Sequence, residues 1–407
     1  MRRFRLYSAV AALAVVALSS LTAVLSQSQN SVQYSQGLLN QKSNFSRGAA
    51  AAMSKPFRGV ATSAGIVEGL FPVRSTGLSA APVRIAAEDF LATLDSGELS
   101  RVQFAIDDLE WRNWSNVDVG IFSRHGISLE EMTELQKSAA WNLLRVALSA
   151  EGLDQTEKIM RTEQALLEIN GEPIRYGEEK YYLTFMGIPS ASEPWGFQLD
   201  GHHLVVNYFV LGDQVVMTPA FYGGEPVFTE TGKYAGNEIL QEQQNLGLAL
   251  MQSLNPSQQG RATIKKAKTG NDNQAEANKD NLTLDFEGIA GSDLSSAQKL
   301  GLLEVVRSFV GKLRDPHAKV TMDEISQHID NTYFAWIGAA EDNSVFYYRI
   351  HSSVILIEFD HENPVGTRQK NTPGTPTRDH IHTVVRTPNG NDYGKDLLAQ
   401  HLATHPH

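Results

Sequence analysis

The sequence predicts a fold of the α+β class, with an antiparallel β-sheet flanked by helices. Apolar residues recur at helical spacing before about residue 170, between about 235 and 314, and again at the end of the chain. Short aromatic and β-branched segments, separated by Gly, Pro and Asp, form two blocks at about 178–222 and 332–387. Helices and strands therefore come in separate groups, which favours α+β over an alternating α/β arrangement.

The first 26 residues have the pattern of a secretory signal peptide. Basic residues at the very start are followed by an apolar run that ends near Leu25 and by small residues. Cleavage is expected after Ala23 or Ser26, which predicts a periplasmic or extracellular protein; an uncleaved N-terminal anchor is the alternative. Residues 27–80 are rich in Ser, Gln, Gly and Ala, and we expect a flexible lead-in there.

Residues 82–404 are expected to form a single domain. Ser128 and Glu131 have the spacing of a capping box at the start of the helical stretch "SLEEMTELQKSAAWNLLRVALSA". The polar segment at about 264–283 is low in apolar residues, which predicts a mobile surface loop. No internal repeat is found. The expected strands are "EKYYLTFMG", "WGFQL", "HHLVVNYFVL" and "QVVMTPAFY" in the first block, and "TYFAWIGA", "VFYYRIHS", "VILIEFD" and "HIHTVVRT" in the second.

The composition excludes several classes of partner and site. The formal net charge is −11, and the N-terminal arginines are the only strong basic cluster, so nucleic acid is not expected as a partner. The absence of Cys excludes disulfides and thiolate metal sites. No membrane contact is expected after signal cleavage. The chain has no HExxH, GxSxG or P-loop motif, so the familiar hydrolase and nucleotide-binding signatures are missing.

The stretch "RDHIHTVVR" carries the first chemical signal. Alternate side chains of a strand share a face, so His380, His382 and Arg386 are expected on one side. The His-x-His spacing allows two imidazoles to converge on one metal ion. The same spacing also occurs by chance in strands without a metal.

The strand "VILIEFD" carries the second signal. Both of its faces are apolar, so Glu358 is expected to be buried, and Asp360 shares its face. A buried carboxylate must be paired or coordinated. Glu358 is therefore either a metal ligand or the partner of Arg349 or Arg386 in a buried ion pair.

The remaining candidate ligands are histidines elsewhere in the chain. His202 and His203 open a strand, and a regular strand sends them to opposite sides, so one of them is expected to face the site. His401 lies on the last helix and is either a further ligand or a histidine at the edge of the core.

Together these side chains are of the types that bind Zn, Cu, Fe or Mn. The expected function is a metal-dependent hydrolase with Zn favoured, in which Glu358 or Asp360 is a base or orients a ligand, and Arg386 binds an anionic group of a small-molecule substrate. The alternatives are a Cu- or Fe-dependent oxidoreductase, a non-enzymatic metal- or ligand-binding envelope protein, and a histidine-rich polar core without an ion.

Several segments resemble a family of bacterial and fungal proteins catalogued as a domain of unknown function. They are "WRNWSN", "WGFQLDGHHLVVNYFV", "TPAFYGGEPV", "YYRIHSSVILIEFD", "HIHTVVR" and "NDYGKDLLAQH", in order over residues 82–404. The resemblance implies no activity. It implies that the polar positions of the site recur in the family: His202, His203, Glu358, Asp360, His380, His382, Arg386, Asp392 and His401. The chain departs from the family in "HENPVGTRQKNTPGTPTRD", which is longer and richer in Pro and Thr, and this implies altered access beside the site.

Overall fold

The computed structural model describes residues 35–405, so the expected signal peptide lies outside the described residues. The centre of the fold is one 13-stranded sheet. Its longer strands are β3 (Tyr181–Met186), β4 (Trp195–Gly201), β5 (Leu204–Leu211), β7 (Ala220–Gly224), β10 (Tyr333–Gly338), β11 (Phe346–His351), β12 (Leu356–His361) and β13 (Ile381–Arg386). The shorter strands are β1 (Gln103–Phe104), β2 (Ile127–Ser128), β6 (Gln214–Val216), β8 (Thr263–Lys265) and β9 (Ile289–Ala290).

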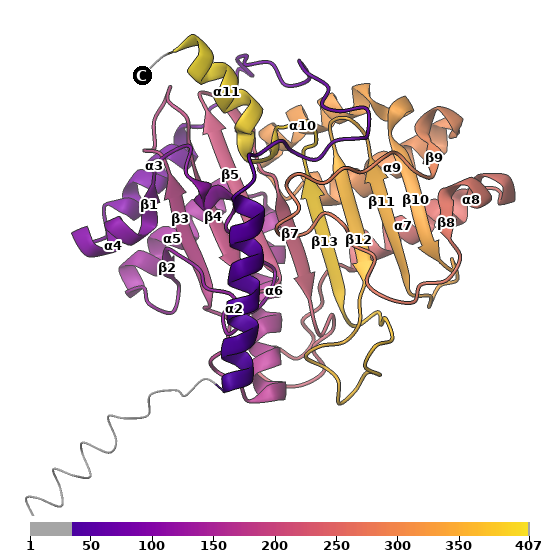
Figure 1. The fold of residues 1–407 in the computed structure, drawn as a ribbon, viewed down its shortest axis with the longest axis horizontal. Helices are drawn as coiled ribbons and strands as arrows, with labels where there is room; N and C mark the ends of the chain where they lie inside the picture. Colours follow the sequence, from indigo (N-terminus) through magenta and orange to yellow (C-terminus); the bar gives the residue numbers. More distant parts are fainter. Residues whose placement is uncertain (1–34, 406–407) are drawn as a thin grey trace, which may run out of the picture.

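The two predicted strand blocks join at the middle of this sheet. The strand order is β1-β3-β4-β5-β7-β13-β12-β11-β10-β8, and β7 pairs antiparallel with β13. β2, β6 and β9 lie beside β3, β5 and β10. The edge strands β1 and β8 pair in parallel with β3 and β10, and the other pairs are antiparallel. The predicted α+β class is confirmed (Figure 1).

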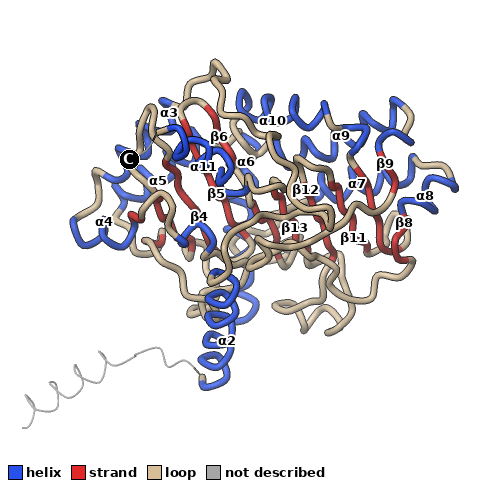
Figure 2. Tube along the Cα trace, turned by 45° about the horizontal axis from the view of Figure 1, so that its top comes forward, coloured by secondary structure: helices blue, strands red, loops and turns tan. Residues whose placement is uncertain are grey.

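The helices are α2 (Gln36–Met53), α3 (Ala81–Leu91), α4 (Ser96–Val102), α5 (Glu134–Ala147), α6 (Ala150–Asn170), α7 (Gln241–Ser253), α8 (Pro256–Ala262), α9 (Ser296–Val310), α10 (Asp315–Gln327) and α11 (Lys395–Thr404). Most of them cover one face of the sheet, whereas α2, α11 and several loops lie over the other face (Figures 1 and 2). The larger apolar core lies between the sheet and α3, α5, α6, α7, α9 and α10, and a smaller core lies under α11 and the loops of the opposite face. Within residues 35–405, none of the helices has the length and apolarity needed to span a membrane.

Helix α2 lies within the segment that the sequence suggests as a flexible lead-in. Ser35 caps its first turn by accepting a hydrogen bond from the Leu38 amide. At the other end, the buried Arg112 guanidinium donates to the carbonyls of Ala52, Met53 and Lys55. A cation at the carbonyl end of a helix is favourable, so a long-range contact that the local composition does not reveal holds this helix.

The predicted capping box at Ser128 has the expected bonds in a different place. The Ser128 and Glu131 side chains exchange hydrogen bonds with each other's backbone, but they do so in a turn after β2. Helix α5 begins later, with a capping box between Thr133 and Gln136. The spacing of Ser128 and Glu131 therefore identified a hydrogen-bonded turn that precedes the helix, and the helix itself begins at the next capping box.

Counted from either edge to the middle of the sheet, the strands follow one another in the same order along the chain. This repeat indicates an internal duplication that the sequence pattern did not reveal. In each half, a capped short helix (α4 or α8) leads into an edge strand, and a helix pair (α5–α6 or α9–α10) precedes the meander. The stacked rows Phe197–Tyr208 and Tyr348–Phe359 are equivalent, with centroids 5.0 Å apart in both. The separation in sequence between Phe197 and Tyr348 is the same as that between Tyr208 and Phe359.

Two glycines record the same duplication. Gly126 and Gly288 have φ of 89° and 95° and precede β2 and β9. A Cβ at either position would overlap the backbone carbonyl of Leu183 or Phe334 on the adjacent strand. The backbone requirement has thus been kept in both halves.

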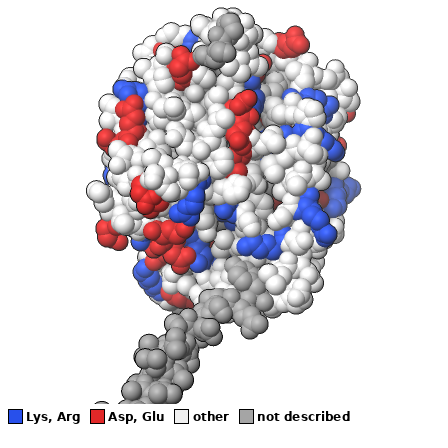
Figure 3. All heavy atoms as spheres, turned by 60° about the vertical axis from the view of Figure 1, so that its left-hand side comes forward, with Lys and Arg blue, Asp and Glu red and all other residues white. Residues whose placement is uncertain are grey.

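Acidic and basic side chains are interspersed on the side of the molecule that carries α4 and β2 (Figure 3). Several of them form exposed ion pairs, such as Arg101 with Glu131 and Lys180 with Glu130. Such pairs contribute little to stability. They leave no large single-sign field on this side.

Candidate metal centre

Two adjacent histidines form the turn between β4 and β5. β4 ends at Gly201 and β5 begins at Leu204, so His202 and His203 are the two loop residues. The φ of His203 is 61°, the left-handed conformation typical of tight hairpins. The expectation that the pair points to opposite sides assumed a regular strand; in the turn, the two rings stack with 3.7 Å between centroids. Both rings reach Glu163 of α6.

The His-x-His segment of β13 lies close to this hairpin, with only the strand β7 between them. His382 pairs with Gly223 of β7, and the Gly223 amide donates to the His203 carbonyl at 2.7 Å. A Cβ at Gly223 would lie 2.8 Å from the Ile381 carbonyl oxygen and 3.1 Å from Cδ2 of His382. Glycine therefore allows the His382 ring to lie close to the neighbouring strand.

Three imidazoles converge at this end of the sheet. His203, His380 and His382 each offer one nitrogen, and these nitrogens lie within 4.8 Å of one another. Nε2 of His380 and Nε2 of His382 are 3.0 Å apart. All three residues are buried, with at most 7% exposure. The structure thus brings together three of the six residues predicted as ligands.

The other ring nitrogen of each histidine faces an oxygen of the protein. Nδ1 of His380 donates to the Asn363 carbonyl at 2.7 Å, and Nδ1 of His203 is 3.1 Å from Glu163 Oε1. Nδ1 of His382 is 2.9 Å from Glu276 Oε1, and Glu362 Oε2 lies 3.1 Å from the same atom. A carbonyl oxygen can only accept, and ionised carboxylates favour the same tautomer, so the Nε2 lone pairs are left for a ligand.

Two lone pairs at 3.0 Å repel unless a cation lies between them. For the Nε2 atoms of His380 and His382, that cation is either a shared proton or a metal ion. A tetrahedral zinc with nitrogen ligands at about 2.0–2.1 Å would place two of them about 3.3 Å apart. The observed spacing is close to this value, so a small adjustment of the rings would accommodate the ion.

Charge and burial act in opposite directions on His382. Burial lowers the pKa of its imidazole, but the carboxylates of Glu362 and Glu276 outweigh this effect and raise the pKa well above its usual range. Burial also raises the pKa of Glu276, and the facing His382 reverses this and lowers it. Positive charge at His382 is therefore favoured, whether a proton or a metal ion supplies it.

The pair behind the hairpin has the opposite balance. Burial lowers the pKa of His203 well below its usual range, and the neighbouring His202 adds to this shift. Burial raises the pKa of Glu163 to about 7, with only partial compensation from His203. His203 is thus neutral near pH 7, which is the form that coordinates a metal.

A fourth carboxylate fixes the loop beside the centre. Glu225 follows β7 and accepts hydrogen bonds from the amides of Val365, Gly366 and Thr367 at 2.8 to 3.1 Å. Its Oε2 also lies 3.6 Å from Nδ1 of His380. Burial raises the pKa of Glu225, but His380 and the amide donors lower it by more. This anion orders the start of the Pro- and Thr-rich segment that follows β12.

Glu358 and Asp360 lie on β12, on the face of the sheet that also carries His382 of β13, and they bind the backbone of a loop. Glu358 accepts from the amide of Ala275 at 2.8 Å and from the Tyr347 hydroxyl. Asp360 accepts from the amide of Asp272 at 2.6 Å and pairs with Lys268. Neither belongs to a group of converging ligands among the described residues. Their role in the structure is to hold the loop after β8.

That loop is the segment at about 264–283 that the sequence identifies as a polar surface loop. It crosses the loop-covered face of the sheet (Figure 1) and supplies Glu276 to His382. Arg386, which is fully buried, donates to the carbonyls of Ala275 and Glu276 and pairs with Asp280 and Asp392. Its guanidinium is engaged by the protein, and the expected contact with an anionic substrate group stays a prediction.

His202 and His401 lie outside the three-histidine group. His202 Nδ1 is 2.8 Å from Glu163 Oε2, and this ring covers His203 on the side toward Tyr176. His401 is on α11, 3.4 Å from Glu193, and stacks on His405. The structure does not bring His401 to the centre.

The residues that sequence reasoning missed are the partners of the imidazoles. They are Glu163, Glu225, Glu276, Glu362 and Asn363. A signal existed for Glu163, which lies among the buried positions of an otherwise amphipathic helix. Glu276 and Glu362 lie in irregular segments, where no periodicity shows which way a side chain points.

Comparison with known families assigns the chain without assigning an activity. Residues 76–395 match the family described as "Protein of unknown function (DUF3500)". Neither the curated proteins nor the solved structures give a match. The match covers most of the chain and includes every residue of the three-histidine group, and the chain therefore belongs to the DUF3500 family.

Proposed function

We propose that this is an exported metalloprotein that binds one divalent transition-metal ion, with Zn²⁺ favoured, through Nε2 of His203, His380 and His382. The supporting observation is that a protein oxygen faces Nδ1 of each ring, which leaves the second nitrogen of each ring for a ligand, in a group whose candidate ligand atoms lie within 4.8 Å of one another. Outer carboxylate or carbonyl partners of this kind accompany almost all metal-bound histidines.

We further propose that the ion serves metal-dependent hydrolysis of a small molecule. Three protein ligands leave a fourth position for water or substrate, as in catalytic zinc sites, whereas structural sites are closed by four ligands. The ion would supply Lewis acidity and lower the pKa of a bound water. Cu or Fe oxidation chemistry uses the same imidazole donors. Burial of the three rings below 10% exposure supports a non-enzymatic binding role as the second candidate.

Metal analysis of the purified protein tests the site. The wild-type protein is expected to carry about one equivalent of metal by mass spectrometry, and the double variant His380→Ala/His382→Ala is expected to carry none. His401→Ala is the matched control, because it removes a histidine that the structure places elsewhere, and it should retain the metal. Retention of metal by the double variant, with folding verified by circular dichroism, would overturn the proposal.

Activity is tested separately on the same samples. Turnover of a panel of small esters and amides should disappear on chelation and return with Zn²⁺. A visible d–d band or a paramagnetic signal would instead identify copper chemistry. Full occupancy by zinc without turnover, and without a water ligand in the X-ray absorption spectrum, would leave the binding role.

A further inference from the structure

The duplication gives the sheet two equivalent ends, which we call the histidine pole and the apolar pole. The histidine pole is the end where the β4–β5 hairpin meets the start of β13. The apolar pole is the opposite end, where the β11–β12 hairpin meets β6 and the start of β7. Each pole therefore combines a hairpin of one half with a strand of the other half.

Cross-strand pairing identifies the residues that correspond at the two poles. The hairpin residue His203 corresponds to Val354, because the rows Phe197–Tyr208 and Tyr348–Phe359 are equivalent. The strand residue His382 pairs with Asp360, and its counterpart Val216 pairs with Phe209. Valines thus occupy two of the positions at which the histidine pole has imidazoles.

A contact to the helix layer is also repeated. At the histidine pole, His202 bonds Glu163 of α6. At the apolar pole, Ser353 lies 3.5 Å from Nδ1 of His328, at the end of α10. The backbone frame of the first site is therefore present a second time, with different side chains.

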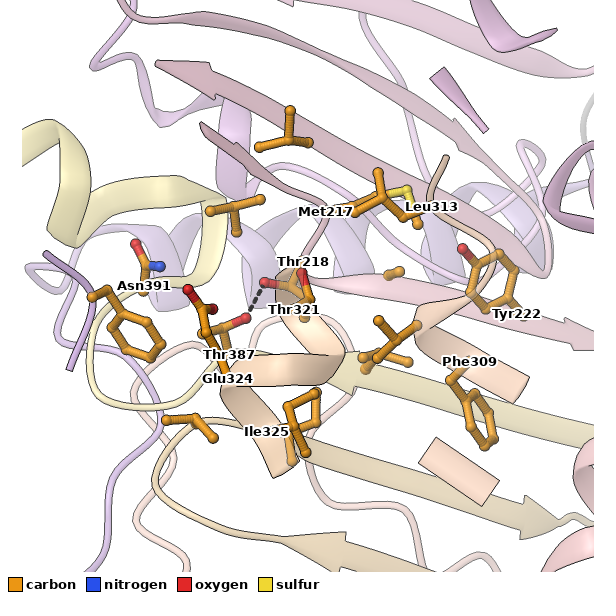
Figure 4. Close-up of a pocket in the computed structure, with 18 residues that line it drawn as sticks. Met217, Thr218, Tyr222, Phe309, Leu313, Thr321, Glu324, Ile325, Thr387 and Asn391 are labelled. Carbon is orange, nitrogen blue, oxygen red and sulfur yellow. Dashed lines mark hydrogen bonds between the residues drawn. The ribbon is translucent and has the colours of Figure 1, made fainter. Parts of the chain in front are cut away.

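The apolar pole encloses a cavity of about 70 Å³ between β6, β7, β13 and the helices α9 and α10. Val216 and Val354 both line it, together with Met217, Leu313 and Ile325. Figure 4 shows the Tyr222 ring at one end, with its hydroxyl directed inward, and the hydrogen-bonded Thr218 and Thr387 toward the other end. The cavity is thus an apolar space with polar groups at both ends.

Tyr222 is the residue that points to a ligand. Its side chain is 1% exposed, and its hydroxyl has no hydrogen-bond partner among the described residues. The other polar groups of the lining are satisfied: Thr218 and Thr387 bond each other at 2.7 Å, and Glu324 pairs with Arg74 at 2.6 Å. A buried tyrosine hydroxyl normally has a partner, so this donor is left for a molecule that enters the cavity.

We propose that the apolar pole is a second ligand site, which takes a short neutral aliphatic group whose one carbonyl oxygen accepts a hydrogen bond from the Tyr222 hydroxyl. The size follows from comparison with an apolar cavity of about 150 Å³ that holds benzene, which suggests about three or four heavy atoms here. The absence of a free charge among the described lining residues selects a neutral group. A short acyl or ketone group has this chemistry.

The probes are acetone and 2-methylpropane, which have the same shape and differ in the oxygen. They are titrated into the full-length protein while the ¹³C-methyl signal of Met217 is recorded, after assignment with Met217→Leu. We expect a saturable shift with acetone. Tyr222→Phe should weaken the binding of acetone about fivefold to tenfold, the usual effect of one hydrogen bond, and leave the binding of 2-methylpropane unchanged.

A second variant separates cavity binding from surface effects. Ala220→Ile fills the lining next to Tyr222 and should abolish the Met217 shift with both probes. His380→Ala/His382→Ala should bind both probes as the wild type does, because the two poles are at opposite ends of β7. No shift of Met217 up to the solubility limit, or equal affinity of wild type and Tyr222→Phe for acetone, would overturn the proposal.

Discussion

At the histidine pole the β4–β5 hairpin presents His203 to β13, whereas at the apolar pole the β11–β12 hairpin presents Val354 to β6. The hairpins have equivalent register, and the helices behind them, α6 and α10, occupy equivalent places in the fold. The first pole has filled its space with imidazoles and carboxylates. The second has filled it with valines and has kept a cavity.

The difference teaches that the duplicated sheet supplies positions and that irregular segments supply the chemistry. Glu276 and Glu362 come from the loops after β8 and after β12. The counterpart of the first loop, after β1, contains a 3₁₀ turn at Leu109–Arg112, and the counterpart of the second is the short turn between β5 and β6. We therefore expect the proposed metal centre to depend on these loop carboxylates as well as on the histidines. The predictions below test this division.

The largest effect is expected from making the histidine pole resemble the apolar one. His203→Val places the residue of the second hairpin on the first and removes one of three ligands. Metal affinity should fall by more than the roughly 10–100-fold typical of losing an outer partner. Competition with a chromophoric chelator measures it. Val354→Ala, the control at the other pole, should leave metal affinity unchanged.

The next effect concerns the stability of the metal-free protein against pH. Burial raises the pKa of Glu163 to about 7, from an ordinary value of 4.5. A raised pKa stabilises the fold fully below pH 4.5 and loses this contribution as pH rises to 7, by up to about 3 kcal/mol. Urea unfolding of chelated protein should show stability falling over this window. In Glu163→Gln, the slope of unfolding free energy against pH should correspond to about one proton fewer over this window.

His382 extends the same test to higher pH. Its carboxylate neighbours raise its pKa well above 6.5, so its contribution to apoprotein stability is present below pH 6.5 and lost as pH rises through the raised value. Metal must displace the proton, so metal affinity should increase over the same range. Titrations at several pH values measure this; a pH-independent metal affinity would contradict the shared position of proton and metal.

A smaller effect is expected from the carboxylates behind the imidazoles. Glu276→Gln leaves an acceptor for Nδ1 of His382 but removes its charge. Metal affinity should fall about 10–100-fold, or about 1.4–2.7 kcal/mol. His328→Gln, which changes the counterpart of Glu163 at the apolar pole, should have no effect. Equal losses in both variants would indicate a general loss of folding.

The sequence predicted features of the regular strands, whereas the contacts made by the loops were not predicted. Period-2 and aromatic patterns predicted the two strand blocks, and the spacing of His380 and His382 predicted two convergent imidazoles. These inferences rest on local geometry, which a sequence shows directly. The alternation of side chains along a strand does not apply to His203, because this residue lies in a hairpin turn with positive φ.

The rest depended on contacts between distant segments. Glu358 and Asp360 were predicted as buried carboxylates, but their partners are backbone amides of a loop. Every residue except proline has such an amide, so the sequence does not show which ones a carboxylate binds. The sequence did not reveal the duplication because equivalent side chains differ between the two halves. Backbone requirements, such as those at Gly126 and Gly288, are the same in both. Arg112, which holds the end of α2, is another such contact.

The smallest effect is expected at the apolar pole. Tyr222→Phe removes a buried hydroxyl that has no partner among the described residues, and leaving such a group unpaired costs about 1–3 kcal/mol. The variant should therefore be more stable than the wild type by about 1 kcal/mol in urea unfolding without ligand, with unchanged metal content. Thr383→Val is the contrasting variant, since its hydroxyl donates to the Tyr222 carbonyl at 2.7 Å, and it should destabilise the same strand pair. If Tyr222→Phe destabilises the protein, the hydroxyl has a partner in solution, and an ordered water in the cavity would replace the proposed ligand as its acceptor.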